Sequence, residues 1–307
     1  MDKPFDVYVL GEINPDLILS GDVMPEFGQV EKLVDSAQLT IGSSSVIFAC
    51  GAARLGLSIG FSGLCGNDVF GHFMLDEMRN HQIDVSAVDV RDGAATGLSI
   101  ILNRQVDRAI LTFPGLISSL QAADIPQEVF SYARHLHVAS YFLQTGLQPD
   151  ILSIFERAHQ QGMTISLDTN WDPSGKWENF NTILKDIDIF LPNENEAMAL
   201  TGAKTPQAAL DILSGKCKTV AIKMGADGAI ATHNGVHAQV NALKIDVVDT
   251  VGAGDTFDSG FVYGYLHDWS LEKTLQFASI CGSLSTRTAG GTQSQPAFTE
   301  VMQYVNG

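Results

Sequence analysis

Residues 249–261 read DTVGAGDTFDSGF and place three small residues directly before an acid. The residues before the elbow alternate in the manner of a strand, whereas Phe257, Phe261 and the apolar residues beyond them recur at helical spacing. The stretch therefore predicts a strand, a glycine elbow at 252–254 and a helix that begins near Asp255. Glycines at such an elbow permit positive φ and let a ligand approach the backbone closely.

The elbow has two interpretations. The first amides of a helix have no acceptor within the helix and lie at the positive end of its dipole, so they bind anions without lysine or arginine. Alternatively, Asp255 only caps the helix and the glycines only turn the chain, which is the simpler interpretation of GAGD alone. The stretch matches neither the dinucleotide pattern, because no third glycine follows, nor the P-loop, because no Lys-Ser or Lys-Thr pair follows.

The composition of the 307 residues limits the classes of partner. The formal net charge of −17 disfavours nucleic acid and anionic lipid. The four cysteines lack metal-ligand spacing and indicate a reduced, cytosolic protein. The start lacks a signal-peptide pattern, and no apolar run approaches the roughly 20 residues of a membrane span. We expect a cytoplasmic protein without a membrane or nucleic-acid partner.

Strands and helices alternate along most of the chain. Strand patterns occupy residues 5–13, 58–66, 135–140, 163–170, 186–193 and 219–225. Helical patterns occupy residues 44–56, 71–82, 149–161, 193–202 and 206–216. Strands separated by helices pair in parallel with right-handed crossovers, which predicts an α/β fold. Residues 228–249 predict a hairpin insert with its turn at 234–235, and two helices, at 255–267 and 271–287, are expected to end the chain.

Two patches of short alternating strands interrupt this pattern, roughly within residues 14–42 and 90–113, the second with a turn at 104–108. We expect these patches to form one small β sheet that projects from the main body. The alternation continues through both regions, so residues 1–307 are expected to form a single domain.

Six motifs occur in the order found in one family of kinases. They are NPD at 14–16, ARLG at 53–56, GNDVFG at 66–71, LPNENE at 191–196, KMGADGA at 223–229 and DTVGAGDTFDSGF at 249–261. From about residue 5 to 300 the chain resembles the ribokinase-like, or PfkB-type, carbohydrate kinases. This resemblance implies a three-layer α/β/α core with a mostly parallel central sheet and a small β-sheet lid. It also implies ATP and Mg²⁺ as cofactors and a sugar as substrate.

The resemblance assigns the chemistry to the elbow. It implies that Asp255 is the catalytic base, which accepts the proton of a sugar hydroxyl as that oxygen attacks the γ-phosphate of ATP. The turn formed by Gly252, Ala253 and Gly254, together with the amide of Asp255, would form the anion hole for the transferring phosphoryl group. Phosphoryl transfer depends on positioning and charge stabilisation, which an acid beside exposed amides supplies.

Further residues are implied on the nucleotide side. Asn193 and Glu196 match the N-x-x-E motif that organises Mg²⁺ and phosphate, although the same pair also reads as a helix cap with its partner at the third helical position. Gly225 and Gly228 would lie along the nucleotide, with Ser279 as a further contact. Lys223 would reach phosphate or ribose, or be a solvated lysine at a strand end.

The sugar side rests on Asp16, a carboxylate able to accept two sugar hydroxyls, with Asn14 as a weaker partner; a plain turn after proline is the alternative for Asp16. Gly42 matches the first glycine of the family's Gly-Gly motif, beside Ser43. Asp168 and Asn170 are candidate polar groups of the pocket floor, although a strand-end Asp-x-Asn is often only a turn. By position, Tyr141, Phe142 and Gln144 are expected to line the pocket.

Three departures from the family pattern bear on the substrate. Ser43 replaces the second glycine, Ile47 an asparagine that binds sugar hydroxyls, and Asp172 an arginine found in many sugar-acid kinases and fructokinases. Loss of the asparagine weakens an assignment to ribose or fructose. Loss of the arginine weakens an assignment to a carboxylated sugar such as 2-keto-3-deoxygluconate.

Residues 285–296, STRTAGGTQSQP, resemble the family's monovalent-cation loop, which would hold K⁺ together with Asp249 and the carbonyl of Val251. Residues 286–287 also read as the plain end of a helix. By the same resemblance, an exposed face of the lid could pair with a second copy to form a homodimer.

We therefore expect an ATP-dependent kinase that phosphorylates a primary hydroxyl of a small neutral sugar. Two alternatives stay open: a nucleoside kinase on the same scaffold, and a sugar- or nucleotide-sensing protein without turnover. Ser43 and Ile47 leave room for the sensor, whereas Asp255 argues against it.

Overall fold

The structure, a computed structural model, describes residues 3–104, 107–177 and 180–305. Its centre is an eight-stranded sheet with the order β14-β13-β12-β11-β10-β9-β1-β4. The strands are β1 (Phe5–Leu10), β4 (Ile59–Ser62), β9 (Ala133–Val138), β10 (Thr164–Leu167), β11 (Ile189–Phe190), β12 (Thr219–Lys223), β13 (Ala229–His233) and β14 (Val236–Val240). Neighbours from β4 to β12 pair in parallel, and β13 and β14 form the antiparallel hairpin at one edge.

The sheet is buried on both faces because its strands are apolar on both faces. In β1, Tyr8 and Leu10 belong to one core cluster, whereas Val7 and Val9 belong to the other. Alternate residues of a strand point to opposite faces, so the two clusters are the two sides of the sheet. Continuous apolar strands of this kind are typical of parallel sheets that are covered on both sides.

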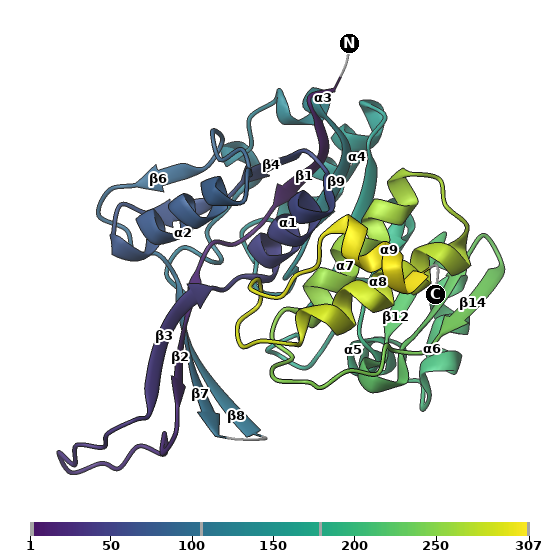
Figure 1. Ribbon diagram of the computed structural model, residues 1–307. Helices are drawn as coiled ribbons and strands as arrows, with labels where there is room; N and C mark the ends of the chain where they lie inside the picture. The colour runs from purple at the N-terminus through teal and green to yellow at the C-terminus, as the bar shows by residue number, and fades with distance from the viewer. Residues whose placement is uncertain (1–2, 105–106, 178–179, 306–307) are drawn as a thin grey trace.

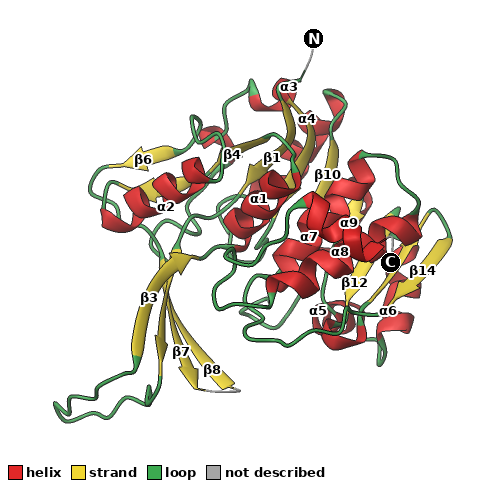
Figure 2. Ribbon diagram, in the orientation of Figure 1, coloured by secondary structure: helices red, strands yellow, loops and turns green. Residues whose placement is uncertain are grey.

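Helices form the two outer layers (Figures 1 and 2). One face is covered by α1 (Ser44–Leu55), α2 (Val69–Asn80), α7 (Ala253–Leu266) and α8 (Leu271–Ser285). The other is covered by α3 (Val129–Tyr132), α4 (Ile151–Gln160), α5 (Glu194–Thr201) and α6 (Pro206–Ser214). Single 3₁₀ turns lie at Ala122–Asp124, Gln148–Asp150, Phe180–Thr182, Leu184–Asp186 and Gly225–Asp227. The predicted three-layer α/β/α core is therefore confirmed.

A second sheet of four strands projects from this body (Figure 1). Its order is β3-β2-β7-β8, with β2 (Pro15–Ser20), β3 (Ser36–Ile41), β7 (Leu98–Arg104) and β8 (Asp107–Phe113). Both predicted strand-rich patches contribute to it, and β2 pairs with β7 in parallel. Residues 105–106 of the predicted turn at 104–108 lie outside the described residues. The assignment of all 307 residues to a single domain stays a prediction. A short pair, β5 (Leu64–Gly66) and β6 (Asp89–Arg91), completes the strands.

Two sequence-based expectations about the C-terminal part were wrong. Residues 245–249 do not form a strand: the amides of Val248 and Asp249 donate to the carbonyl of Thr286 at 2.8 and 3.1 Å instead of to a neighbouring strand. A third helix, α9 (Phe298–Val305), follows the two that were expected to end the chain. The apolar residues of α9 pack against α8. They recur every three or four residues, a helical spacing that is visible in the sequence.

Among the described residues, no helix is both long and apolar enough to cross a membrane.

Candidate active site

A cavity of about 1000 Å³ opens where the parallel strands end and the four-stranded sheet begins. Lid strands β7 and β8 contribute Ser99, Ile101, Arg108 and Ile110 to its wall. The residues that the sequence singled out and that line this cavity are Asp16, Ser43, Asp168, Asn170, Asn193, Glu196, Lys223, Gly225, Gly228, Val251, Gly252, Ala253, Gly254, Asp255 and Ser279. Motifs more than 200 residues apart in the chain thus meet at one site. Ligands of open α/β sheets bind at this end of the strands.

The elbow before α7 is shaped by Gly252, which has a left-handed φ of 71°. A Cβ at this position would lie 2.8 Å from the Cα of Gly291 and 2.9 Å from Cγ2 of Ile47, so no side chain fits. Within the described residues, the amide of Ala253 donates to the carbonyl of Thr250 at 3.3 Å, whereas the amides of Gly254 and Asp255 have no acceptor. Two donors at a helix N-terminus therefore remain available in the cavity.

The N-cap residue of α7 is Gly252, and among the described residues no backbone amide donates to the carboxylate of Asp255. The helix-cap interpretation of the acid is therefore wrong. Its side chain is almost wholly buried, and burial together with the negative charges of Asp168 and Glu12 raises the pKa of Asp255 to about 8. The positive charge of Lys223 and a hydrogen bond from Ser44 oppose this increase. Such a carboxyl group keeps an appreciable affinity for a proton at neutral pH.

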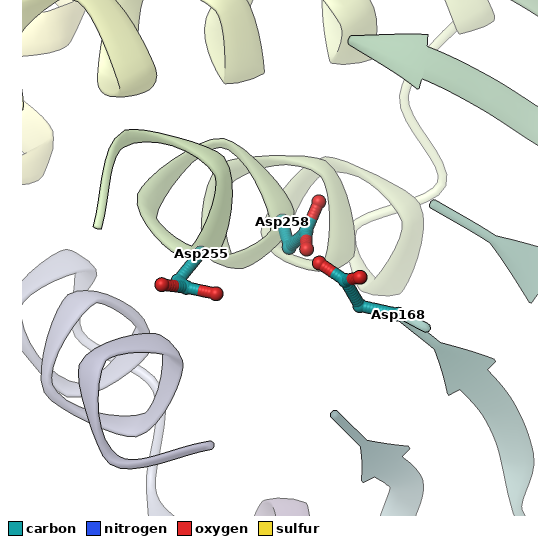
Figure 3. A group of neighbouring side chains, drawn as sticks. All are labelled: Asp168, Asp255 and Asp258. Atoms are coloured by element: carbon teal, nitrogen blue, oxygen red, sulfur yellow. The ribbon is translucent and has the colours of Figure 1, made fainter. Parts of the chain in front are cut away.

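Three acids lie close together beside α7 (Figure 3). Asp255 and Asp258 extend from α7 and Asp168 from the end of β10, and one carboxylate oxygen of each lies within 4.8 Å of the others. Nζ of Lys223 donates to Asp168 at 2.8 Å and to both oxygens of Asp258 at 2.9 and 3.0 Å. Because this ammonium group already balances two of the acids, we interpret the cluster as a buried ion-pair network.

Lys223 is therefore not a solvated lysine at a strand end, which was one of the two alternatives predicted for it. Burial would lower the pKa of Lys223, but the attraction of Asp168, Asp258 and Glu196 raises it above its ordinary value. The lysine lines the cavity while its ammonium group is bonded to carboxylates of the protein. Its contact with a nucleotide stays a prediction.

Both interpretations of Asn193 and Glu196 are compatible with the structure. The two residues form a reciprocal cap at the start of α5, in which each side chain accepts the backbone amide of the other at 2.9 Å. Burial and the charge of Asp168 raise the pKa of Glu196 to about 7. Within the described residues, the hydrogen bonds to its carboxylate use Oε2, which leaves Oε1 as an oxygen ligand of the kind that Mg²⁺ prefers. The residues thus fit an Mg²⁺ ion bound at this end of the cavity.

Asp16 lies at the start of β2 and reaches the cavity from the lid side. Burial and the charge of Asp249 raise the pKa of Asp16 to about 7, against the lowering effect of Arg108. A side chain at Gly42 would collide with the Asp16 carboxylate, so the glycine leaves room for the acid without lining the cavity itself. Asn14 is buried beside them and also lies outside the cavity wall.

The aromatic residues expected in the pocket wall lie elsewhere. Ser140 has a left-handed φ of 53°, and the chain that follows it directs its side chains into the core. Phe142 packs edge-on against Trp177 at 5.1 Å and against Tyr141 at 5.2 Å between ring centres. Gln144 is buried and donates to the carbonyl of Ala139 at 2.6 Å. The assignment of Phe142 as a substrate contact, and of its neighbours as pocket residues, is therefore not supported.

The departures from the family pattern have local explanations. Asp172 is buried and accepts the amides of Ser174, Lys176 and Trp177 at 2.7 to 3.0 Å, so it organises its own loop. Ile47 lines the cavity and packs where Gly252 and Gly291 leave room for it. The site thus presents an apolar side chain at the position where the family usually has an asparagine.

Asp249 joins two loops at the rim. One of its oxygens accepts the amide of Val251 at 3.1 Å and the other accepts the amide of Gly290 at 3.0 Å. Val251 and Thr286 line the cavity, whereas Asp249 lies outside its wall. The proximity of these loops fits the expected cation site, which stays a prediction.

Sequence reasoning missed three polar residues of the site. Asp258 lies one helical turn after Asp255, so its position on the same face was readable from the spacing. Glu12, two residues after the end of β1, is buried and accepts a hydrogen bond from Ser43, which lines the cavity. Ser44, the first residue of α1, bonds to Asp255 and carries no signal in the sequence that distinguishes it from a helix start.

Comparison with known proteins agrees with this geometry. Residues 5–297 match the family described as pfkB family carbohydrate kinase. The chain is 30% identical to 2-dehydro-3-deoxygluconokinase of Bacillus subtilis (strain 168), over 92% of this chain and 91% of that protein. It is 25% identical to 5-dehydro-2-deoxygluconokinase of Geobacillus thermodenitrificans (strain NG80-2), over 99% and 94%. The structure of ribokinase from Arabidopsis thaliana complexed with ribose and ATP superposes with a TM-score of 0.84 at 22% identity, over all of both chains.

Proposed function

The chain belongs to the pfkB family of carbohydrate kinases, and on that premise we propose that it transfers the γ-phosphoryl group of ATP to a primary hydroxyl of a small, neutral sugar. One observation carries this proposal. Asp255 and the two elbow amides that lack an acceptor among the described residues line the same cavity as Asp16, the carboxylate on the lid side. A proton acceptor, an anion hole and a hydroxyl-binding acid are thereby combined in one site.

The residues of the chain perform distinct tasks in this proposal. Asp16 accepts hydroxyls of the sugar and orients it, while Asp255 accepts the proton of the attacking hydroxyl. The amides of Gly254 and Asp255 stabilise the negative charge that develops on the transferring phosphoryl group. Bound near Glu196, Mg²⁺ would supply further neutralisation of phosphate charge. Closure of the four-stranded sheet over the sugar would exclude water.

A neutral sugar is supported by the charges around the pocket. Asp16, Asp168 and Asp255 line it, and Asp172, at the position of the family's arginine, is committed to its own loop. A carboxylated sugar is the second candidate for two reasons. Arg108 of β8 lines the cavity, and the first relative above is named as a 2-dehydro-3-deoxygluconokinase.

The direct test is a coupled assay of ADP release with ribose, fructose, 2-keto-3-deoxygluconate and adenosine. Turnover highest with a neutral sugar supports the proposal. A preference for 2-keto-3-deoxygluconate, abolished in Arg108→Ala, would replace it with the second candidate. A preference for adenosine would establish the nucleoside kinase. Calorimetric binding of sugar or nucleotide without ADP release from a broad panel would favour the sensor.

We further propose that K⁺ binds between residues 249–251 and the loop that contains Gly290, a placement supported by the two bonds of Asp249. Comparison of initial rates in potassium and tetramethylammonium salts tests it. We also propose pairing of two copies through the lid, since Ile110, Leu111 and Phe113 of β8 are exposed. Sedimentation of the wild type and of Leu111→Lys tests that pairing. We propose a cytoplasmic location as well, which agrees with the four buried free cysteines.

A further inference from the structure

A chain of hydrogen bonds runs from Asp255 through Ser44, Asn170 and Ser140 to a second buried carboxylate, Glu12. We infer that this chain fixes the orientation and the proton affinity of Asp255, with Glu12 and Ser44 as its positioning residues. The inference rests on the proposed role of Asp255 as the base. It assigns a function to two residues that neither the motifs nor the relatives point to.

Three of the four bonds in the chain, those between Ser44 and Glu12, are 2.6 to 2.9 Å long. The amide nitrogen of Asn170 donates to Oγ of Ser44 at 2.6 Å and to Oγ of Ser140 at 2.7 Å. Oγ of Ser140 donates to Oε1 of Glu12 at 2.9 Å, and the hydroxyl of Ser44 donates to the carboxylate of Asp255. The network thus joins the end of β1, the loops after β9 and β10, the start of α1 and the start of α7.

The direction of every bond follows from the donors available. The side-chain amide nitrogen of Asn170 has two hydrogens and no acceptor capacity, so both serine hydroxyls must accept from it. Each hydroxyl then has one hydrogen left, which it gives to a carboxylate. Both ends of the chain are therefore acceptors, and the bond from Ser44 favours the ionised form of Asp255, while burial and the neighbouring acids keep the pKa of Asp255 raised to about 8.

Hydrogen bonds to both carboxylate oxygens fix the side chain of Glu12 in place. Its side chain is buried, and its carboxylate accepts from the hydroxyls of Ser43, Ser45 and Ser140 at 2.6 to 3.0 Å and from the amide of Ser45 at 3.3 Å. All of these partners are neutral. Among the described residues no ion pair involves this carboxylate, so a negative charge on it would not be balanced by a bonded cation.

The backbone around the network is strained. Ser43, Ser140 and Asn170 have φ values of 67°, 53° and 51°, in the left-handed region that residues with a side chain rarely adopt. Strain of this kind concentrates at functional sites. All three strained residues contribute side chains to this one network. Hydrogen bonds to one buried acid do not by themselves require three strained residues. The concentration of strain here therefore supports a functional role for the network.

The charged groups that face Asp255 come from several elements. Asp168 follows β10, Lys223 ends β12, Asp258 lies one turn further along α7, and Glu12 follows β1. Removal of the Glu12 charge should make Asp255 easier to ionise, because one negative neighbour is lost. Removal of the Ser44 hydroxyl should make it harder to ionise, because a bond to the charged form is lost. The two changes thus have opposite signs, which a purely structural network does not predict.

Glu12→Gln separates charge from geometry. An amide oxygen in place of Oε1 keeps the bonds from Ser43, Ser140 and the amide of Ser45. The amide nitrogen then faces only the hydroxyl of Ser45, which can rotate to accept from it. Ser44→Ala removes one donor and Ser44→Thr restores it. Ser62→Ala is the matched control, since it removes a buried hydroxyl bonded to Tyr8 outside the network.

The experiment measures kcat and KM against pH for these variants with ATP and the best sugar of the panel. Relative to wild type, the acid limb of kcat should move down by about half a pH unit or more in Glu12→Gln and up by a similar amount in Ser44→Ala. Ser44→Ala should also lower the plateau of kcat by about 10-fold, because a bond to a charged group is lost, with KM little changed. Ser44→Thr should recover most of that loss, and Ser62→Ala should match wild type.

Shifts of the same sign in Glu12→Gln and Ser44→Ala, or no shift in either, would overturn the inference. If Glu12→Gln does not fold, the Ser44→Ala and Ser44→Thr pair decides alone. Asp255→Asn separates this outcome from failure of the proposed function. An inactive Asp255→Asn with unshifted network variants refutes only the positioning role, whereas an active Asp255→Asn refutes the base itself.

Discussion

Nζ of Lys223 lies 2.8 Å from Oδ2 of Asp168, so the end of β12 is tied to the end of β10 directly beside the elbow. The same ammonium group bonds both oxygens of Asp258 on α7. All three side chains are almost fully withdrawn from solvent. One cation therefore stabilises two buried acids and also opposes the proton affinity of Asp255.

Lys223→Met should destabilise the protein strongly. Removal of one partner of a buried ion pair leaves an uncompensated charge, which costs roughly 3–5 kcal/mol. Denaturant unfolding monitored by circular dichroism measures the free energy of unfolding. Lys218→Met is the matched control, because Lys218 is exposed and lies 3.8 Å from Asp188. A loss for Lys223→Met no larger than for the control would contradict the network.

Asp255→Asn tests the base. Because the amide cannot accept the hydroxyl proton, kcat should fall by roughly 10²–10⁴ while the affinity for ATP stays similar. Steady-state kinetics with the best sugar, together with calorimetric titration of ATP, measures both quantities. Turnover near that of wild type in this variant would retire the mechanism.

The pH dependence of the wild type follows from the same residue. Burial and the charges of Asp168 and Glu12 raise the pKa of Asp255 to about 8, so the ionised base becomes abundant only as the pH rises through that value. We expect kcat to increase from pH 6 through pH 8, where half of the carboxyl groups are ionised, and to level off only about one pH unit higher. A rate profile that is flat across this range would show that the ionisation of Asp255 does not limit turnover.

The free energy of unfolding should show the opposite dependence on pH. The folded pKa of Asp255 lies above the ordinary value of 3.8, so the folded state binds this proton more tightly than the unfolded state. The resulting stabilisation is fully present below about pH 4 and is lost as the pH rises through about 8. Asp255→Asn, which cannot ionise, should therefore exceed the wild type in free energy of unfolding at pH 9 by roughly 5 kcal/mol, and match it at pH 4. Equal stability at both pH values would contradict the raised pKa.

The sequence predicts the fold and the elbow well because both depend on local patterns. The alternation of apolar residues, the close of α1 at Gly56 and the turn at Asn234 and Gly235 need no distant contact to be read. The wall of the pocket is harder, because it depends on where loops turn. The left-handed φ of Ser140 directs Phe142 into the core, and a serine at such a position leaves no mark in the sequence.

Pairs of residues that are far apart in the chain could not be predicted from the sequence, for the same reason. Lys223 and Asp168 are 55 residues apart, and Glu12 and Ser140 are 128 apart. Each is a polar residue at a strand end, which in isolation resembles an exposed turn. Only the order of the parallel strands brings these ends to one edge, and that order is a property of the whole sheet.

Substitutions at Gly254 and at Gly252 distinguish the binding of phosphate at the anion hole from the backbone conformation of the elbow. A Cβ added to Gly254 would lie 3.5 Å from Nζ of Lys223, an ordinary contact, and alanine is the better helix former. Gly254→Ala should therefore fold as well as wild type, yet its methyl group would occupy the cavity where a phosphoryl group approaches the amides. We expect kcat/KM for ATP to fall by about 10-fold or more, because loss of a single anion-hole donor costs at least as much.

Gly252→Ala should fail for a different reason. Its positive φ and the contacts at 2.8 and 2.9 Å with Gly291 and Ile47 should cost roughly 1–3 kcal/mol of stability. Thermal unfolding and steady-state kinetics of both variants together separate the two effects. If Gly254→Ala turned over ATP like the wild type, phosphate would not approach the elbow from the cavity side, and the anion hole would have to be sought elsewhere.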